Sequence, residues 1–209
     1  LRHGHTFQTL ADIRGYENLL FDMYDSDDRL PKLIDIVEEF NLAIVHKYLE
    51  SGAEWMSYAE DLGMQVGPMI SPELFLEYIK PSYTRLMKPA REKGCIIHMH
   101  SDGDIRDLVD HLIDSGVHAI NLQDTVNGID WIKENLTGKI CVDLDIDRQN
   151  VTVNGSVDEI DAFIRHEVET LGSKEGGLMM IYGLYPGLPL ENVKALMDAM
   201  ERYAVFYSR

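Results

Sequence analysis

Short apolar runs alternate with longer amphipathic ones along the chain, and this alternation limits the possible folds more than any other feature. Helical spacing of apolar residues occupies 27–52, 71–94, 103–116, 156–172 and 189–206. Strand-like runs lie at 54–61, 95–103, 118–124, 139–147 and 177–185. Strands that alternate with helices form right-handed βαβ units around a parallel sheet. The sequence therefore predicts an α/β fold of five βα units, with residues 1–209 as a single domain.

Boundary residues mark two of the helical patterns. Ser71 with Pro72 is typical of an N-cap and a first helical turn. Ser156 and Glu159 have the spacing of a capping box. Within 71–94, Pro81 is expected to divide the pattern into two helices, because proline removes a backbone donor and crowds the preceding turn.

Polar residues fall on one face of three of the predicted strands. Alternate residues of a strand share a face, so His98 and His100 lie together. The same rule groups Asn121 with Gln123, and Cys141 with the aspartates at 143, 145 and 147. A parallel sheet covered by helices on both sides would be apolar on both faces. The pattern instead favours a TIM (β/α)8-type barrel, whose lumen opens into a site at the C-terminal ends of the strands.

Imidazole and carboxylate groups gather where the run at 95–103 ends. His100 and Asp102 are predicted to bind a divalent ion weakly, with His98 as a further donor, because these ligand types suit such ions. Glu60 and Asp61 end the preceding strand and are candidate catalytic groups. Structural interpretations stay open: a buried histidine often serves only as a hydrogen-bonding residue, and Glu60 and Asp61 can cap the following segment.

The charge balance excludes several classes of partner. The chain has 19 basic and 36 acidic residues and a net charge of -17, which argues against binding nucleic acid or an anionic membrane. No apolar run approaches the length of a membrane span. Cys95 and Cys141 both lie in apolar runs, so free buried thiols are expected rather than a disulfide. The cytoplasm is the expected location.

Several sequence blocks, in their order along the chain, resemble one known superfamily. They are GPMISPELF, HSDGDI, DIDRQ, GGLMMIYG and PLENV, and they resemble the uroporphyrinogen decarboxylase superfamily, which also holds cobalamin-dependent methyltransferases. The resemblance runs from RGYENLL to the C-terminus. It implies a TIM barrel of which this chain would be the C-terminal part, without the first strands; the absence of an initial Met fits an open-ended chain.

The resemblance also implies roles for individual residues. The zinc-dependent methyltransferases bind metal through a His-x-Cys pair on this strand and a cysteine near the last strand. In this chain His100 takes the histidine position, Asp102 stands in place of the first cysteine, and Tyr182 stands near the position of the second. A thiolate-rich zinc site is therefore not expected. His98, Glu60 or Asp143 would complete a site with nitrogen and oxygen ligands.

The main functional hypothesis is a methyltransferase-like enzyme that passes a methyl group between a small substrate or thiol and a corrinoid protein. His100 and Asp102 would hold a metal or polarise the substrate, and Glu60 or Asp61 would act as general base. Residues expected to bind substrate are His98, Gln123, Asp143, Asp145 and Tyr182.

Two alternatives stay open. The first is uroporphyrinogen decarboxylase of tetrapyrrole biosynthesis, which needs no cofactor; against it, a lumen lined by aspartates would repel a polycarboxylate substrate. The second is an incomplete barrel without activity of its own. Because five strands cannot close an eight-stranded barrel, the open side is expected to be covered by the N-terminal segment or by a second copy in a homodimer.

Overall fold

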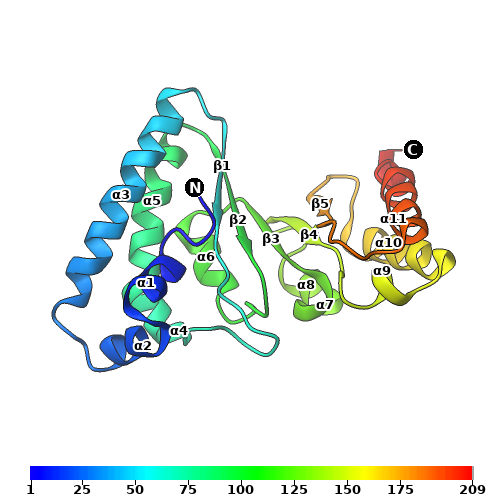
Figure 1. Cartoon of the computed structure of the whole chain (residues 1–209). Helices are drawn as coiled ribbons and strands as arrows, with labels where there is room; N and C mark the ends of the chain where they lie inside the picture. Colours follow the sequence, from blue (N-terminus) through cyan, green and yellow to red (C-terminus); the bar gives the residue numbers. More distant parts are fainter. Residues whose placement is uncertain (209) are drawn as a thin grey trace. The chain divides into compact units, whose positions relative to one another are not determined.

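The computed structural model describes residues 1–208, and five strands form its sheet (Figure 1). The strands are β1 (Trp55–Ala59), β2 (Ile96–Ser101), β3 (Ala119–Gln123), β4 (Cys141–Asp145) and β5 (Leu178–Ile181). They follow one another in chain order across a parallel sheet. The predicted α/β architecture with five parallel strands is confirmed. The largest difference in length is at β5, which ends at Ile181 although the apolar run continues to Tyr185.

Helices precede and separate the strands. They are α1 (Phe7–Arg14), α2 (Tyr16–Tyr24), α3 (Leu30–Glu50), α4 (Pro72–Leu74), α5 (Lys80–Glu92), α6 (Val109–Ser115), α7 (Asp124–Asn127), α8 (Ile129–Asn135), α9 (Val151–Asn154), α10 (Val157–Leu171) and α11 (Leu190–Tyr203), with a π-helical segment η1 (Phe75–Ile79) and a 3-10 turn η2 (Phe206–Ser208). The long helices α3, α5, α10 and α11 match predicted patterns. None of the helices within residues 1–208 combines the length and the apolar character needed to cross a bilayer.

Pro81 does not end the helix, in contrast to the predicted division into two helices. The chain is helical from Pro72 to Glu92, passing through α4, η1 and α5. Pro81 lies in the first turn of α5, directly after the wider turn of η1. A π turn gives the proline ring room and does not require the backbone N–H that proline lacks.

The chain consists of two compact units, residues 1–120 and 121–209. In the first, α3 packs against α5 (Figure 1). The strands β1 and β2 pair in a register that sets Ser57 beside His98 and Ala59 beside His100. Burial alternates along β2: Ile97 and Met99 are fully buried, whereas His98 and His100 are partly exposed. The two histidines therefore share a face, as predicted.

The loops that follow β1 and β2 touch backbone to backbone. Gly103 has φ +82°, and a Cβ there would lie 2.1 Å from the carbonyl carbon of Gly63. Next to this contact the Asp104 amide donates to the Met64 carbonyl at 2.7 Å. The Asp104 carboxylate accepts the Gly67 amide at 3.1 Å. Only glycine permits so close an approach, so the two loops are fixed to each other.

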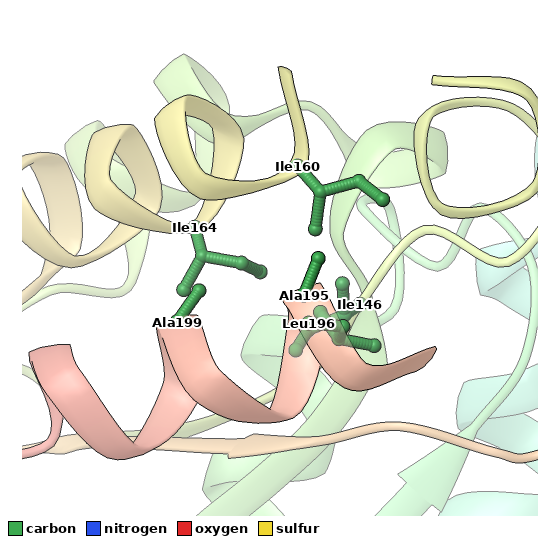
Figure 2. Packing of buried hydrophobic residues seen from close by; sticks show 6 residues of the cluster. All are labelled: Ile146, Ile160, Ile164, Ala195, Leu196 and Ala199. Carbon is green, nitrogen blue, oxygen red and sulfur yellow. The ribbon is translucent and has the colours of Figure 1, made fainter. Parts of the chain in front are cut away.

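The second unit is built around α10 and α11. Figure 2 shows its core, in which side chains of the two helices meet one residue that follows β4. The cluster comprises Ile146, Ile160, Ile164, Ala195, Leu196 and Ala199. The predicted capping box of α10 is present, since Ser156 and Glu159 each bind the other's backbone amide. Helical spacing of apolar residues thus correctly located both helices.

Candidate functional site

Two histidines and two aspartates lie together in the first unit, just beyond the ends of β1 and β2. His3 Nε2 lies 3.1 Å from Asp61 Oδ1. His100 Nε2 lies 3.6 Å from the same oxygen and 3.7 Å from Asp102 Oδ1. One ligand atom each from His3, Asp61 and His100 lie within 4.8 Å of one another. Three of these four residues were predicted to belong to a site; His3 was not.

Strand register explains why Asp61 meets His100. Ala59 pairs with His100, and the Glu60 amide donates to the His100 carbonyl at 3.0 Å. Asp61 therefore follows directly beside the end of β2. Its carboxylate accepts the Asp102 amide at 3.3 Å and the Gln8 side-chain amide at 3.2 Å.

Asp61 is the anionic centre of the group. Its partial burial acts to raise its pKa, but the nearby imidazoles of His100 and His3 and the Asp102 amide outweigh burial and lower the pKa to about 2. At neutral pH the carboxylate is ionised, and it lies between two imidazoles.

Glu60 holds the segment that carries His3. Its carboxylate accepts the backbone amides of Thr6 at 2.5 Å, Phe7 at 3.0 Å and Gln8 at 3.3 Å. These are the free amides at the start of α1, which favour a carboxylate. Tyr83 donates its hydroxyl to the same group. His3, three residues before Thr6, is thereby brought to Asp61.

Glu60 is shielded from solvent. The side chain is fully buried, and burial raises its pKa to about 7 against the opposing hydrogen bonds from Tyr83 and the α1 amides. Because its oxygens face α1, the structure places Glu60 beside the His3 segment. The general-base role stays a prediction.

His98 has other partners than His100. Its Nδ1 lies 2.8 Å from Ser57 Oγ, and its ring lies 5.4 Å from that of Trp55. It shares a strand face with His100 but is not among the three residues whose ligand atoms converge.

The converging group has the donors of a metal site. Zinc accepts histidine nitrogen and carboxylate oxygen at about 2.0–2.2 Å, and catalytic zinc sites have three protein ligands and one open position. Two nitrogens and one carboxylate oxygen meet that requirement, with Asp102 close by. The residues present therefore fit a zinc-class ion, although they do not reproduce a thiolate site.

A cavity of about 610 Å³ borders this group. His3, Gln8 and Tyr16 line it together with Met69 from the loop after β1. It has room for a small substrate beside His3, with an apolar wall at Met69 and a charged group, Arg2, on its lining.

The predicted substrate-binding residues of β3 and β4 lie in the second unit. Asp145 is buried and its carboxylate lies 3.1 Å from the Arg148 guanidinium. Arg148 also donates to the Tyr185 hydroxyl at 2.7 Å and lies over that ring. Asp143 is buried, and its backbone carbonyl accepts the Asn121 side chain at 2.7 Å. Arg148 was not predicted, because it lies in the loop after β4, where spacing does not determine which side chains meet.

Gln123 and Tyr182 take different positions. Gln123, 9% exposed, ends β3 and precedes α7. Tyr182 packs against the core of α10 and α11, and its hydroxyl donates to Thr152 Oγ1 at 3.0 Å. Its substrate-binding role stays a prediction, and these contacts place it on the helix side of β5.

Asp147 has a structural explanation. Its carboxylate accepts the backbone amides of Gln149, Asn150 and Val151 at 3.2, 3.0 and 2.6 Å. The aspartate thus holds the turn into α9, which accounts for the last of the three alternating aspartates.

Two further carboxyl groups form a buried pair. Glu167 of α10 is fully buried. Burial, together with the neighbouring carboxylates of Asp124 and Asp147, raises the pKa of Glu167 to about 10. Glu167 is therefore protonated at neutral pH beside Asp124, whose carboxylate accepts the Asp147 amide at 2.6 Å.

This pair predicts a pH-dependent stability. The folded Glu167 keeps its proton between its ordinary pKa of 4.5 and about 10, whereas the unfolded chain loses it, so the free energy of unfolding falls as pH rises through that window. Glutamine does not titrate, so in Glu167→Gln the free energy of unfolding no longer falls with pH on account of this residue. The wild-type fall is up to about 1.4 kcal/mol per pH unit. Urea unfolding at pH 6 to 9 measures it, with Glu169→Gln on the exposed face of α10 as control. Parallel profiles for the wild type and Glu167→Gln would contradict the assignment.

Comparisons with known proteins agree with this architecture. Residues 4–203 match the family described as Uroporphyrinogen decarboxylase (URO-D). The methylcobamide:CoM methyltransferase MtaA of Methanosarcina barkeri is 24% identical over 179 residues, covering 84% of this chain and 50% of the relative. The methylcobamide:CoM methyltransferase MtbA of Methanosarcina mazei is 21% identical over 182 residues, covering 87% and 52%.

A solved structure shows the same fold. A methyltransferase from Methanosarcina mazei superposes with a TM-score of 0.72 at 20% identity, covering 93% of this chain and 56% of that one. The five βα units are thus a partial TIM-type barrel, as predicted. The chain spans about half the length of the curated relatives it matches.

Proposed function

The chain belongs to the uroporphyrinogen decarboxylase (URO-D) family, and we propose that it is a methyltransferase-like enzyme that passes a methyl group between a small substrate or thiol and a corrinoid protein. The matched relatives are named methylcobamide:CoM methyltransferases. The observation that carries the proposal is the convergence of His100, Asp61 and Asp102 at the ends of β1 and β2. TIM-type barrels have their active sites at these strand ends.

In this proposal His100 and Asp102 hold a divalent ion. A bound zinc ion would lower the pKa of a thiol and so supply a thiolate at neutral pH. Asp61, whose pKa is about 2, keeps a negative charge beside His100 and offsets the charge of the ion. The Asp102 amide donates to Asp61, which fixes the carboxylate.

The loops keep this geometry rigid. The Leu62 amide donates to Ser101 Oγ at 2.9 Å, and Gly63 lies against Gly103. A preorganised site of this kind orients a substrate at little entropic cost. The adjoining cavity at His3 gives the substrate a place. Gln123, Asp143 and Asp145 are proposed to bind substrate at the strand ends of the second unit.

Two partners belong to the proposal. A corrinoid protein would donate or accept the methyl group, because the relatives are named for a methylcobamide substrate. A second copy of the chain is proposed as a partner in a homodimer, since side chains such as Trp55 and Ile96 on β1 and β2 are 41% and 45% exposed.

Methyl transfer from methylcobalamin to a thiol tests the proposal. Zinc-loaded protein is expected to convert the corrinoid absorption spectrum in the presence of thiol. His100→Ala should lower the rate at least about 100-fold, since loss of even an outer-shell group costs 10–100-fold. His46→Ala, exposed on α3, is the control. Unchanged corrinoid with every thiol tried, alongside turnover of uroporphyrinogen, would replace this proposal with decarboxylation.

A further inference from the structure

We propose that His3 is a metal ligand, and that with Asp61 and His100 it forms a three-residue centre with two nitrogen ligands and one oxygen ligand for a zinc-class divalent ion. This inference rests on the proposed metal centre at His100, and it changes the ligand set: His3 and Asp61 take the place of Asp102. It does not depend on which reaction the centre serves.

The distances support a ligand set. Four-coordinate zinc with bonds of about 2.0–2.1 Å separates neighbouring ligand atoms by roughly 3.3–3.5 Å. His3 Nε2 and His100 Nε2 lie 3.1 and 3.6 Å from Asp61 Oδ1. The third separation, between the two imidazole nitrogens, is at most 4.8 Å. Small side-chain rotations would bring the three ligand atoms to bonding distance of one ion.

The His3 segment is held by more than its own side chain. The Gly4 amide donates to the Ala59 carbonyl at 2.8 Å, next to the end of β1. The amides of residues 6–8, at the start of α1, bind the buried Glu60 carboxylate. These contacts leave the side chain of His3 half exposed, with 50% of its surface accessible. A preformed position with one open side suits a ligand of a catalytic ion better than a closed structural site.

The donor set restricts the ion. Imidazole nitrogen suits zinc, copper, iron and nickel, whereas magnesium and calcium prefer oxygen ligands. Histidine binds a metal ion in its neutral form, so two imidazoles and the Asp61 carboxylate would leave a centre filled by a divalent ion with a single positive charge. Zinc is therefore expected to bind, and magnesium is not expected to compete at millimolar concentration.

Isothermal titration of the full chain with zinc tests the inference. One ion per chain is expected, and His3→Ala, Asp61→Asn and His100→Ala should each weaken binding at least about 100-fold. His46→Ala, exposed on α3, should bind like the wild type. Thermal melting of each variant shows whether weaker zinc binding comes from a lost ligand or from unfolding. His3 is half exposed, so His3→Ala should melt like the wild type without zinc.

Each outcome separates the inference from the proposed function. If His100→Ala loses zinc while a folded His3→Ala binds it unchanged, the ligand role of His3 is wrong and the centre at His100 stands. If the wild type takes up no zinc, the inference is overturned. If zinc binds through His3 but no methyl group is transferred, the inference stands and the proposed function fails.

Discussion

Gly103→Ala is expected to lower the free energy of unfolding by at least about 4 kcal/mol, a loss at the extreme of single substitutions. The new Cβ would lie 2.1 Å from the Gly63 carbonyl carbon and 2.3 Å from its oxygen, a backbone overlap that no side-chain rotation relieves. The loops after β1 and β2 must then separate, which also moves Asp61 and Asp102. Thermal melting should show a decrease of about 10 °C or more.

A glycine with the same backbone angle separates steric overlap from conformational strain. Gly52 also has φ +82°, but nothing lies within 4 Å of a Cβ built there. Gly52→Ala should cost only about 1–2 kcal/mol, the penalty of the left-handed conformation. Equal losses in the two variants would mean that the contact between the loops contributes nothing.

Glu60→Ala is expected to destabilise the chain by about 3–5 kcal/mol, because it leaves several buried donors without an acceptor. The donors are the Thr6, Phe7 and Gln8 amides and the Tyr83 hydroxyl. Chemical unfolding measures the loss. Glu39→Ala, on the exposed face of α3, should change stability by less than about 0.5 kcal/mol.

A milder variant links Glu60 to His3. At pH 8, above the Glu60 pKa of about 7, Glu60→Gln keeps one oxygen acceptor but removes the negative charge at the start of α1. We expect the folded variant to bind zinc roughly 10-fold more weakly, because outer-shell contacts orient ligands. Wild-type zinc affinity in folded Glu60→Gln would show that the charge is not needed to position His3.

Periodicity located most of the fold. Alternation of apolar runs predicted all five strands, and long stretches with helical spacing of apolar residues predicted α3, α10 and α11. The N-terminal helices α1 and α2 were not predicted, because each is short and has weak capping signals. At the start of α1 the acceptor for the free amides is Glu60, which lies far along the chain. The effect of Pro81 was also missed, since a π turn leaves no signature in the spacing.

The residues of the candidate site that lie at the ends of β1 and β2 could be predicted from the sequence. His100, Asp102 and Asp61 follow from the rule that polar residues at parallel strand ends share an edge. Glu60 follows from the same rule, yet its side chain faces α1. The position of His3 depends on a tertiary contact with no local sequence signal; a second histidine two residues later, His5, is instead buried beside Tyr83 with its pKa lowered by burial to about 3.

X-ray absorption at the zinc edge of the loaded protein identifies the ligands of the ion, because it reports the atoms bound to it. We expect a shell of nitrogen and oxygen at about 2.0–2.1 Å with the outer-shell scattering of two imidazoles, falling to one imidazole in His3→Ala. A sulfur shell at about 2.3 Å would assign the ion to Cys95 or Cys141 and contradict a centre built from His3, Asp61 and His100.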